Sequence, residues 1–488
     1  MIPMTLNQIK TKIARDQSRK IKFKERLNIL NDELKSIIRN ELSVMFAPET
    51  FDDMKNYIDA SNNLAKRICS EISLVYNDEP VRRVTPKSHD KRYQEIVTQM
   101  RLDAKMQRVN YYLNGLNDLI LMPAIYGTPT QMTDEGVIFN NRMDMNILTP
   151  DRVTVFEDED DPTTIKALAI EDRFFDESGK EITLYYYWSP LEHYILNSEF
   201  QKQYVLGNEQ GLNPYWEYNQ EGAFYPFIPI HNSERISSFW DESSGSDLFE
   251  ATKSLAIKNT FIYFMFPMQF KQMAIQTDTI DANQPSVKNP QVKSPLHVIQ
   301  TNGQTQVLDW QSQLEQLKNL VESQLYQVGS AYGISAENFK LTATETSGFA
   351  RMISKERLLE IRKSQVKNYR NIEQAIFEAS AIANNLYSLG NEITDSAKLT
   401  VDFIDPGFPS PPIEELAVVE KKMSLGLTNI LEVIKSENPD IKTDEEAEEV
   451  LEKNLEVRNR IQSKFSGLFQ GFKFENKESG GDNADDNN

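Results

Sequence analysis

Residues 309–334 read DWQSQLEQLKNLVESQLYQVGSAYGI, and residues 347–389 read SGFARMISKERLLEIRKSQVKNYRNIEQAIFEASAIANNLYSL. In the first segment apolar residues recur at spacings of three and four, which predicts one helix with a single apolar stripe: Leu314, Leu317, Val321, Leu325 and Val328. Gly333 can supply the left-handed residue that ends this helix. The second segment predicts a helix from Ser347 to Leu389, roughly 60 Å long at about 1.5 Å per residue. Because that exceeds the core of one compact domain, we interpret it as a strut in a large assembly.

Composition limits the class of protein. A chain of 488 residues is expected to hold about three domains, and 39% hydrophobic with 10% aromatic residues predicts a folded chain. The single cysteine, Cys69, excludes an intramolecular disulfide and fits a reducing compartment. The basic start of the chain lacks the apolar segment of a secretory signal. The net charge of −20 argues against tight nucleic-acid binding by the whole chain, because phosphate affinity comes mainly from Lys and Arg. It leaves room for a surface that DNA slides past.

The N-terminal half combines helices with an antiparallel β region. Residues 6–44 predict one basic helix, and its cations have two interpretations, a solvated face or a contact with an acidic partner or DNA. A further helix is predicted from Tyr93 to Leu121. Strands of a meander are then expected at 153–156, 165–170, 182–188 and 193–196, with a short strand at 227–232. The acidic run 157–161 lacks the alternation and glycine of a calcium loop, so a solvated turn is favoured.

The remaining sequence predicts mostly helix. A helix with an apolar side begins at Ser246-Asp247, and a proline-rich insertion over 271–307 separates it from the helix described first. A strand is expected at 399–404, two or three short helices over 413–454, and a disordered acidic tail beyond about residue 475. The fold class predicted from these elements is α+β, mainly α.

No catalytic or metal-binding pattern is present. The four histidines are His89, His193, His231 and His297, and none of them has a second His or a Cys at ligand spacing. Cys69 has no adjacent base. The sequence around Lys253-Ser254 lacks the second glycine of a phosphate loop. We therefore expect no enzymatic activity, no cofactor and no metal. Polar residues interrupt the apolar segment 254–275, so no membrane-spanning helix is expected.

Three segments together resemble the portal (head–tail connector) proteins of tailed bacteriophages. The first runs from Asn63-Leu64-Ala65-Lys66-Arg67-Ile68 to Asn77-Asp78-Glu79-Pro80-Val81, and the second joins Phe227-Ile228-Pro229-Ile230 to Gly245-Ser246-Asp247-Leu248. The third joins Ala331-Tyr332-Gly333-Ile334-Ser335 to Thr346-Ser347-Gly348-Phe349-Ala350 across a polar loop. Their order and spacing over roughly residues 60–390 carry the resemblance.

The resemblance implies a portal-like ring subunit with named parts. These would be a wing over 1–245, stem helices over 246–270 and 309–335, a clip over 271–308, a tunnel loop over 336–346, a long helix and strand returning to the wing over 347–405, and a helical crown over 406–474, followed by the tail 475–488.

It also implies two sets of functional residues. The tunnel loop would face DNA in the channel with Asn338, Phe339, Lys340, Leu341, Thr342, Ala343, Thr344, Glu345 and Thr346. The clip would contact the terminase or the adaptor through Lys271, Asp278, Asp281, Lys288, Lys293 and His297. Phe339 and Lys340, the only aromatic residue and the only cation of the loop, either contact the DNA backbone or, in the case of Phe339, pack on a neighbouring subunit.

The implied function is that of a ring, usually of twelve copies, at one capsid vertex of the virion, assembled in the host cytoplasm. Double-stranded DNA would pass through it during packaging and ejection, and its partners would be the terminase large subunit, the major capsid protein or scaffold, and a head–tail adaptor. Three alternatives remain: another virion or tail structural protein, an enzyme of unrecognised class, and a membrane pore built on Phe261–Phe266.

Overall fold

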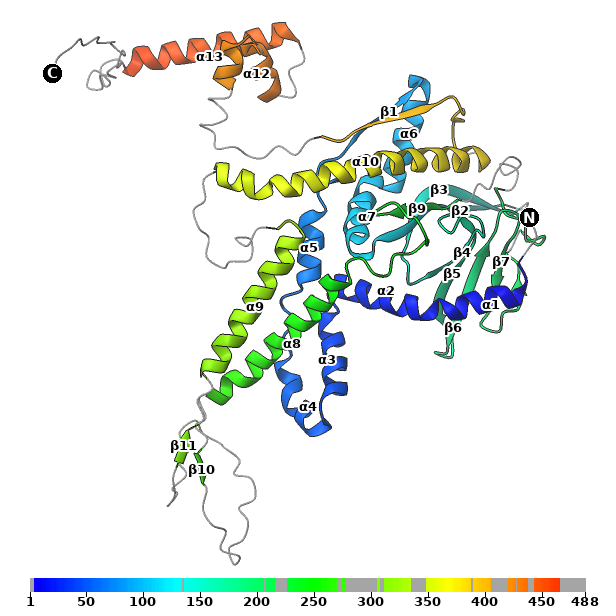
Figure 1. Ribbon diagram of the computed structural model, residues 1–488. Coiled ribbons are helices and arrows are strands. Elements are labelled where there is room, and N and C mark those ends of the chain that lie inside the picture. Colours follow the sequence, from blue (N-terminus) through cyan, green and yellow to red (C-terminus); the bar gives the residue numbers. More distant parts are fainter. Residues whose placement is uncertain are drawn as a thin grey trace, which may run out of the picture. The chain divides into compact units, whose positions relative to one another are not determined.

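A computed structural model describes residues 4–133, 136–205, 208–215, 226–269, 274–276, 305–307, 311–334, 348–387, 389–404, 419–426, 428–437 and 443–465. The chain divides into two compact units, Met1–Pro406 and Gly407–Asn488. The fold is mixed α+β and mainly α, as predicted (Figure 1).

The chain begins with three consecutive helices, so the prediction of one helix over residues 6–44 is wrong. They are α1 (Leu6–Arg15), α2 (Gln17–Leu30) and α3 (Leu34–Met45). Asp32, with a φ of 69°, turns the backbone between α2 and α3 and prevents a continuous helix. The short helices α4 (Pro48–Met54) and η1 (Lys55–Tyr57) follow, and then α5 (Leu64–Ile72), which buries Cys69.

The predicted helix from Tyr93 to Leu121 is also wrong in its extent. Two residues with left-handed backbone, Arg101 and Asn117, delimit α6 (Lys87–Met100) and α7 (Leu102–Leu116). The chain then enters strand β2 (Asp118–Thr133), which pairs antiparallel with β3 (Gly136–Leu148) and β9 (Ile228–His231). The short strand expected at 227–232 is thus confirmed.

The predicted antiparallel meander is confirmed as a five-stranded sheet. Its strands follow chain order, β4 (Val153–Glu157), β5 (Ile165–Phe175), β6 (Glu181–Trp188), β7 (His193–Leu196) and β8 (Lys202–Gln203). Ile9 and Ile13 of α1 pack on aromatic and aliphatic residues of this sheet. Figure 1 shows α1 and α2 running along the sheet region.

Three long helices follow where they were predicted. They are α8 (Ser246–Gln269), α9 (Gln311–Ala331) and α10 (Gly348–Leu386), the last with 39 residues. Strand β12 (Lys398–Asp402) then pairs antiparallel with β1 (Val81–Thr85). Tyr369, Ile372 and Ile376 of α10 are buried in the main core. The long helix is therefore fixed to the N-terminal part both by packing and by the strand that follows it.

The second unit is helical in its described residues. Residues 419–424 form a short helical segment, followed by α12 (Ile430–Glu437) and α13 (Asp444–Phe465). Short helices were expected here, but α13 continues past residue 454, where the prediction ended. The predicted tail, 475–488, lies outside the described residues. In the part of the chain that is described, no helix is both long and apolar enough to cross a membrane.

Candidate functional site

The antiparallel helices α8 and α9, which we call the helix pair, run side by side, with α8 lying against the body of the first unit (Figure 1). By the body we mean α1–α7, α10, β12 and the β sheets apart from the two-stranded ladder of β10 (Ala274–Gln276) and β11 (Thr305–Val307). The Tyr332 hydroxyl, just after α9, donates to Asp247 at the start of α8 over 3.0 Å, and Lys258 contacts Gln324 further along. The start of α8 thus lies beside the end of α9.

The first turn of α8 is held by two residues from distant helices. Arg26 of α2 donates to the carbonyl of Glu242 at 2.7 Å, and to the Ser246 hydroxyl at 2.7 Å. Asn117, at the end of α7, donates to the carbonyl of Ser244 at 2.7 Å. Arg26 is buried, and hydrogen bonds from a charged donor in a buried setting are among the strong ones. The base of the helix pair is therefore rigidly connected to the body.

Asp118 joins several residues at the same junction. Its carboxylate is fully buried, lies 2.7 Å from His231 Nδ1, and accepts from Arg235 Nε at 3.1 Å and from the Asp241 backbone N–H at 2.7 Å. Burial raises the pKa of Asp241, but hydrogen bonds from Ser244 and Ser243 outweigh it and bring the pKa well below its usual range. The carboxylates of Asp118 and Asp241 thus fix the segment that leads from β9 into α8.

One side of α8 packs along α3–α5. The hydroxyl oxygens of Thr252 and Thr260 accept the backbone N–H groups of Ala65 and Asp59, at 3.0 and 3.1 Å. Lys253 lies 2.8 Å from Glu25 and also from Glu41. Edge-to-face ring contacts continue toward the outer end, in the pairs Phe46–Phe261 and Tyr57–Phe264. α8 is thus half embedded in the body.

α9 instead exposes a continuous stripe. Its exposed residues include an uncharged set at heptad-like spacings of four and three: Gln316, Leu320, Ser323, Gln327 and Ser330. Such a face can approach another helix or a polyanion without a strong attraction or repulsion by charge. We call these five residues the α9 stripe.

The inner end of α9 closes with a turn that precedes the predicted tunnel loop in the sequence. The Ile334 N–H donates to the Gly329 carbonyl at 2.8 Å and the Gly333 N–H to Ser330 at 3.1 Å, with a φ of 77° at Gly333, which is a Schellman motif. A Cβ on Gly333 would lie 3.1 Å from Arg357 and 3.2 Å from Ile361 of α10. Gly333 therefore lies against α10 at a point about three helical turns, roughly 14–20 Å, after the start of that helix.

The predicted site residues themselves cannot be placed. All nine tunnel-loop residues, 338–346, and all six clip residues, Lys271, Asp278, Asp281, Lys288, Lys293 and His297, lie outside the described residues. The structure describes the helices and strands that lie next to them in the sequence. Strands β10 (Ala274–Gln276) and β11 (Thr305–Val307) pair antiparallel at the outer end of the helix pair, within the insertion predicted over 271–307.

The basic N-terminal residues have a role that sequence reasoning missed. Lys20 is buried and lies 2.8 Å from Glu171 of the five-stranded sheet, and Arg19 donates to the carbonyls of Pro150 and Val153 at 2.8 and 2.6 Å. Burial lowers the pKa of Lys20, and the pairing with Glu171 partly offsets this. Neither interpretation offered for this helix holds for these cations, because their partners lie within the same chain.

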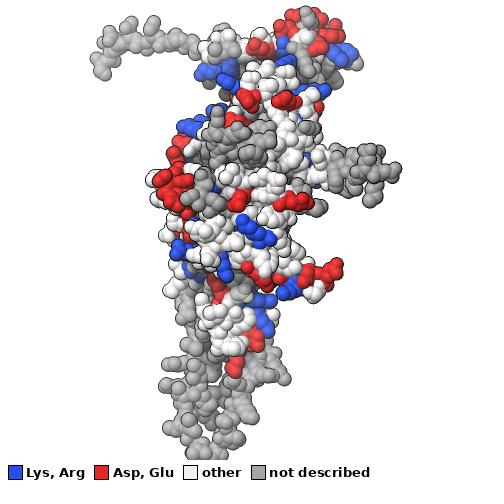
Figure 2. All heavy atoms as spheres, turned by 90° about the vertical axis from the view of Figure 1, so that its right-hand side faces the viewer, with Lys and Arg blue, Asp and Glu red and all other residues white. Residues whose placement is uncertain are grey.

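Surface charge gives no indication of a broad DNA-binding face in the view of Figure 2. Blue and red groups are interspersed among uncharged atoms there, without an extended basic area. The weak nucleic-acid binding expected from the net charge of −20 stays a prediction.

The described residues hold no cluster of three or more His, Cys, Asp or Glu that could bind a metal ion.

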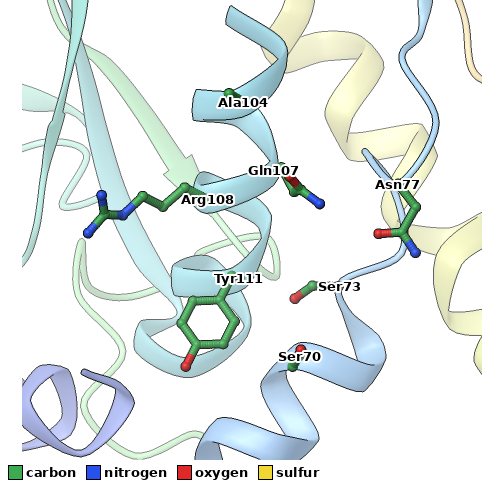
Figure 3. Close-up of a pocket in the computed structure, with 7 residues that line it drawn as sticks. All are labelled: Ser70, Ser73, Asn77, Ala104, Gln107, Arg108 and Tyr111. Carbon is green, nitrogen blue, oxygen red and sulfur yellow. The ribbon is translucent and has the colours of Figure 1, made fainter. Parts of the chain in front are cut away.

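A small cavity of about 300 Å³ lies between α5, the segment after it and α7 (Figure 3), lined by Ser70, Ser73, Asn77 and Tyr111 among others. Arg108 also lines the cavity, and its side chain points away from the serines in this view. Cys69 is buried, and burial raises the pKa of its thiol to about 12, which leaves it unreactive.

Comparison with known proteins adds no assignment. No protein-family model matches the chain, and no curated protein matches it either.

Proposed function

We propose that the protein is the portal subunit of a tailed bacteriophage. Copies of it would form a ring-shaped DNA conduit at one capsid vertex. The genome would be packaged through it by the terminase motor and later ejected, and the ring would also be the platform for head–tail attachment. The chain itself would carry no catalytic activity. Its partners would be double-stranded DNA, the terminase large subunit, the major capsid protein or scaffold, and a head–tail adaptor.

One observation carries this proposal, the arrangement around the helix pair. Two antiparallel helices run side by side, the first of them packed on the body; a small β ladder lies at their outer end, and a 39-residue helix begins beyond their inner end. A strand after that helix returns to the N-terminal part through β1. A portal subunit needs this order, since the stem has to connect a clip on one side with a tunnel loop and long helix on the other.

The chemistry of the α9 stripe supports the same proposal. A conduit has to let a polyanion pass without gripping it, and affinity for phosphates depends on the number of cations. The stripe has five exposed, uncharged residues over roughly 21 Å. In a ring this face would meet either the channel or a neighbouring copy, and both surroundings tolerate amide and hydroxyl groups.

The test is the shape and mass of the purified full-length chain, from negative-stain electron microscopy with light scattering. We expect rings with a central hole and a mass near twelve subunits, formed by the protein alone or with scaffold present. In a packaging reaction with an ATP-driven terminase, DNA uptake should depend on these rings. A filament, or a compact dimer that resists dilution, would overturn the proposal.

A further inference from the structure

A cavity of about 420 Å³ opens between the β2–β3 hairpin and the five-stranded sheet. Ile170 pairs with Tyr186, and Trp188 pairs with His193, so these four side chains share one face of the sheet. Met122 and Asn146, paired across the hairpin, contribute to the opposite wall. The volume falls within the roughly 300–1,000 Å³ of small-molecule sites.

His193 is the polar group at the inner wall of this cavity. It is only 7% exposed, and its ring stacks on Trp188 with centroids 3.5 Å apart. Its Nδ1 lies 3.2 Å from the Tyr187 carbonyl oxygen, which can only accept, so Nδ1 carries the proton and Nε2 presents a lone pair. Among the described residues no donor reaches Nε2. Nε2 is open to solvent, so a ligand donor that reaches it takes the place of water.

The charges around the cavity cancel. At its edge Arg152 and Asp172 form an ion pair at 3.0 Å, and the Tyr126 hydroxyl donates to Asn146 at 3.0 Å. Burial lowers the pKa of His193 to about 4, so its imidazole is neutral at physiological pH. A charged ligand would lose hydration here without gaining an unpaired counter-charge. The surroundings favour a neutral ligand.

We propose that this cavity binds a neutral aromatic ring that carries an O–H or N–H donor, with the ring against Trp188 and Tyr186 and the donor on His193 Nε2. Aromatic walls favour a flat ring, and the lone pair on Nε2, which lacks a donor among the described residues, favours a ring with a donor. A free phenolic molecule and a tyrosine side chain of a partner protein share this chemistry. The site lies in the β region, away from the helix pair, and does not depend on ring formation.

The first experiment compares p-cresol with toluene on the full-length protein, using ligand-observed NMR to measure both affinities. One hydrogen bond predicts that p-cresol binds about tenfold more tightly. His193→Phe keeps a ring on Trp188 but removes the acceptor, so this preference should disappear. Tyr204→Phe is the matched control, since Tyr204 is 53% exposed on the same part of the chain and does not line the cavity.

Three results would overturn the proposal: no saturable binding of p-cresol, equal affinity for p-cresol and toluene, or an unchanged preference in His193→Phe. If that variant does not fold, the ¹⁵N resonance of the histidine Nε2 in the native protein replaces it. This resonance should shift upfield when p-cresol is added and stay fixed with toluene. A resonance that ignores p-cresol refutes the proposed hydrogen bond.

Peptides distinguish the two sources of the ring. The peptide Gly-Gly-Tyr-Gly-Gly should displace p-cresol if the cavity receives a protein side chain, while Gly-Gly-Phe-Gly-Gly should displace it about tenfold less well. If p-cresol binds with the expected preference and neither peptide displaces it, the ligand is a free phenolic molecule. Either result keeps the aromatic site.

Discussion

Replacing Glu373 by Gln tests how the long helix is anchored. Glu373 is fully buried in α10 and accepts two hydrogen bonds from Arg82, from Nε at 2.8 Å and from Nη2 at 2.7 Å. The Tyr76 hydroxyl donates to the same carboxylate at 2.7 Å. Burial, followed by the nearby Glu373 charge, raises the pKa of Tyr76 well above its usual range, so it remains a donor. The cluster joins α10 to β1 and to the segment after α5.

The magnitude follows from what the substitution leaves behind. Removing one partner of a buried ion pair costs about 3–5 kcal/mol, because the other charge stays buried. Arg82 keeps its contact with Asp103, at 2.6 Å from Nη1, which reduces the loss. If the glutamine oxygen keeps the bonds from Tyr76 and Arg82 Nη2, its NH2 group faces the Arg82 Nε donor and cannot accept from it. We expect the free energy of unfolding to fall by about 3 kcal/mol.

The assay is urea unfolding followed by circular dichroism, with hydrogen exchange of α10 as a local measurement. Glu378→Gln on the same helix is the matched control, because Glu378 is exposed and its one hydrogen bond is with Gln374. It should change stability by less than about 0.5 kcal/mol. The reasoning is refuted if Glu373→Gln costs no more than Glu378→Gln, or if exchange in α10 is unchanged.

Three further outcomes are expected. Lys20→Met should lower the free energy of unfolding by about 3 kcal/mol. Lys22→Met is the control and should lower it by less than about 0.5 kcal/mol, because the Lys22 side chain is 64% exposed. Equal effects of the two variants in urea unfolding would contradict the buried pairing of Lys20. Burial lowers the pKa of His193 from 6.5 to about 4 in the folded protein. As the pH drops from 6.5 toward 4, the His193 imidazole therefore takes up a proton in the unfolded chain before it does so in the folded one. Stability should fall over this range by up to about 3 kcal/mol. That dependence, followed by thermal unfolding, should be weaker in His193→Phe. Gln327→Cys treated with a bis-maleimide should give cross-linked dimers on a denaturing gel if the α9 stripe meets a neighbouring copy, while the native protein should give none, since Cys69 is buried.

The helices and the meander could be predicted because each has a strong period of its own. The spacing of three and four in 314–328 and the alternation in 182–188 report on local structure without knowledge of distant residues. The β2–β3 hairpin could not be predicted in this way. Leu119 to Met122 form a continuous apolar run, which suits a buried helix and a buried strand equally. The left-handed backbone at Asn117 decides between them, and an asparagine only permits that conformation.

The candidate sites differ in the same way, because some have a local sequence signal and others depend on residues far apart in the sequence. The loop and clip residues were assigned from resemblance, and they remain predictions because the described residues only frame them. The cavity at His193 was missed, since its walls come from strands separated in sequence and no motif connects them. The one local signal was the aromatic run 185–188, which fits an ordinary strand as well as a binding wall.

The N-terminal cations show why charge alone misleads. A run of Lys and Arg on a predicted helix suggests a surface, yet Arg26 is buried and donates to backbone carbonyls more than 200 residues away. Its partners form the turn from which α8 starts. The same turn contacts Asn117, where the chain passes from α7 into β2. The direction of the helix pair is therefore set by residues of α2 and α7, and a change at Arg26 should alter that direction before it alters the helices themselves. For a conduit built from such pairs, the N-terminal helices would be part of the channel's geometry although they lie outside it.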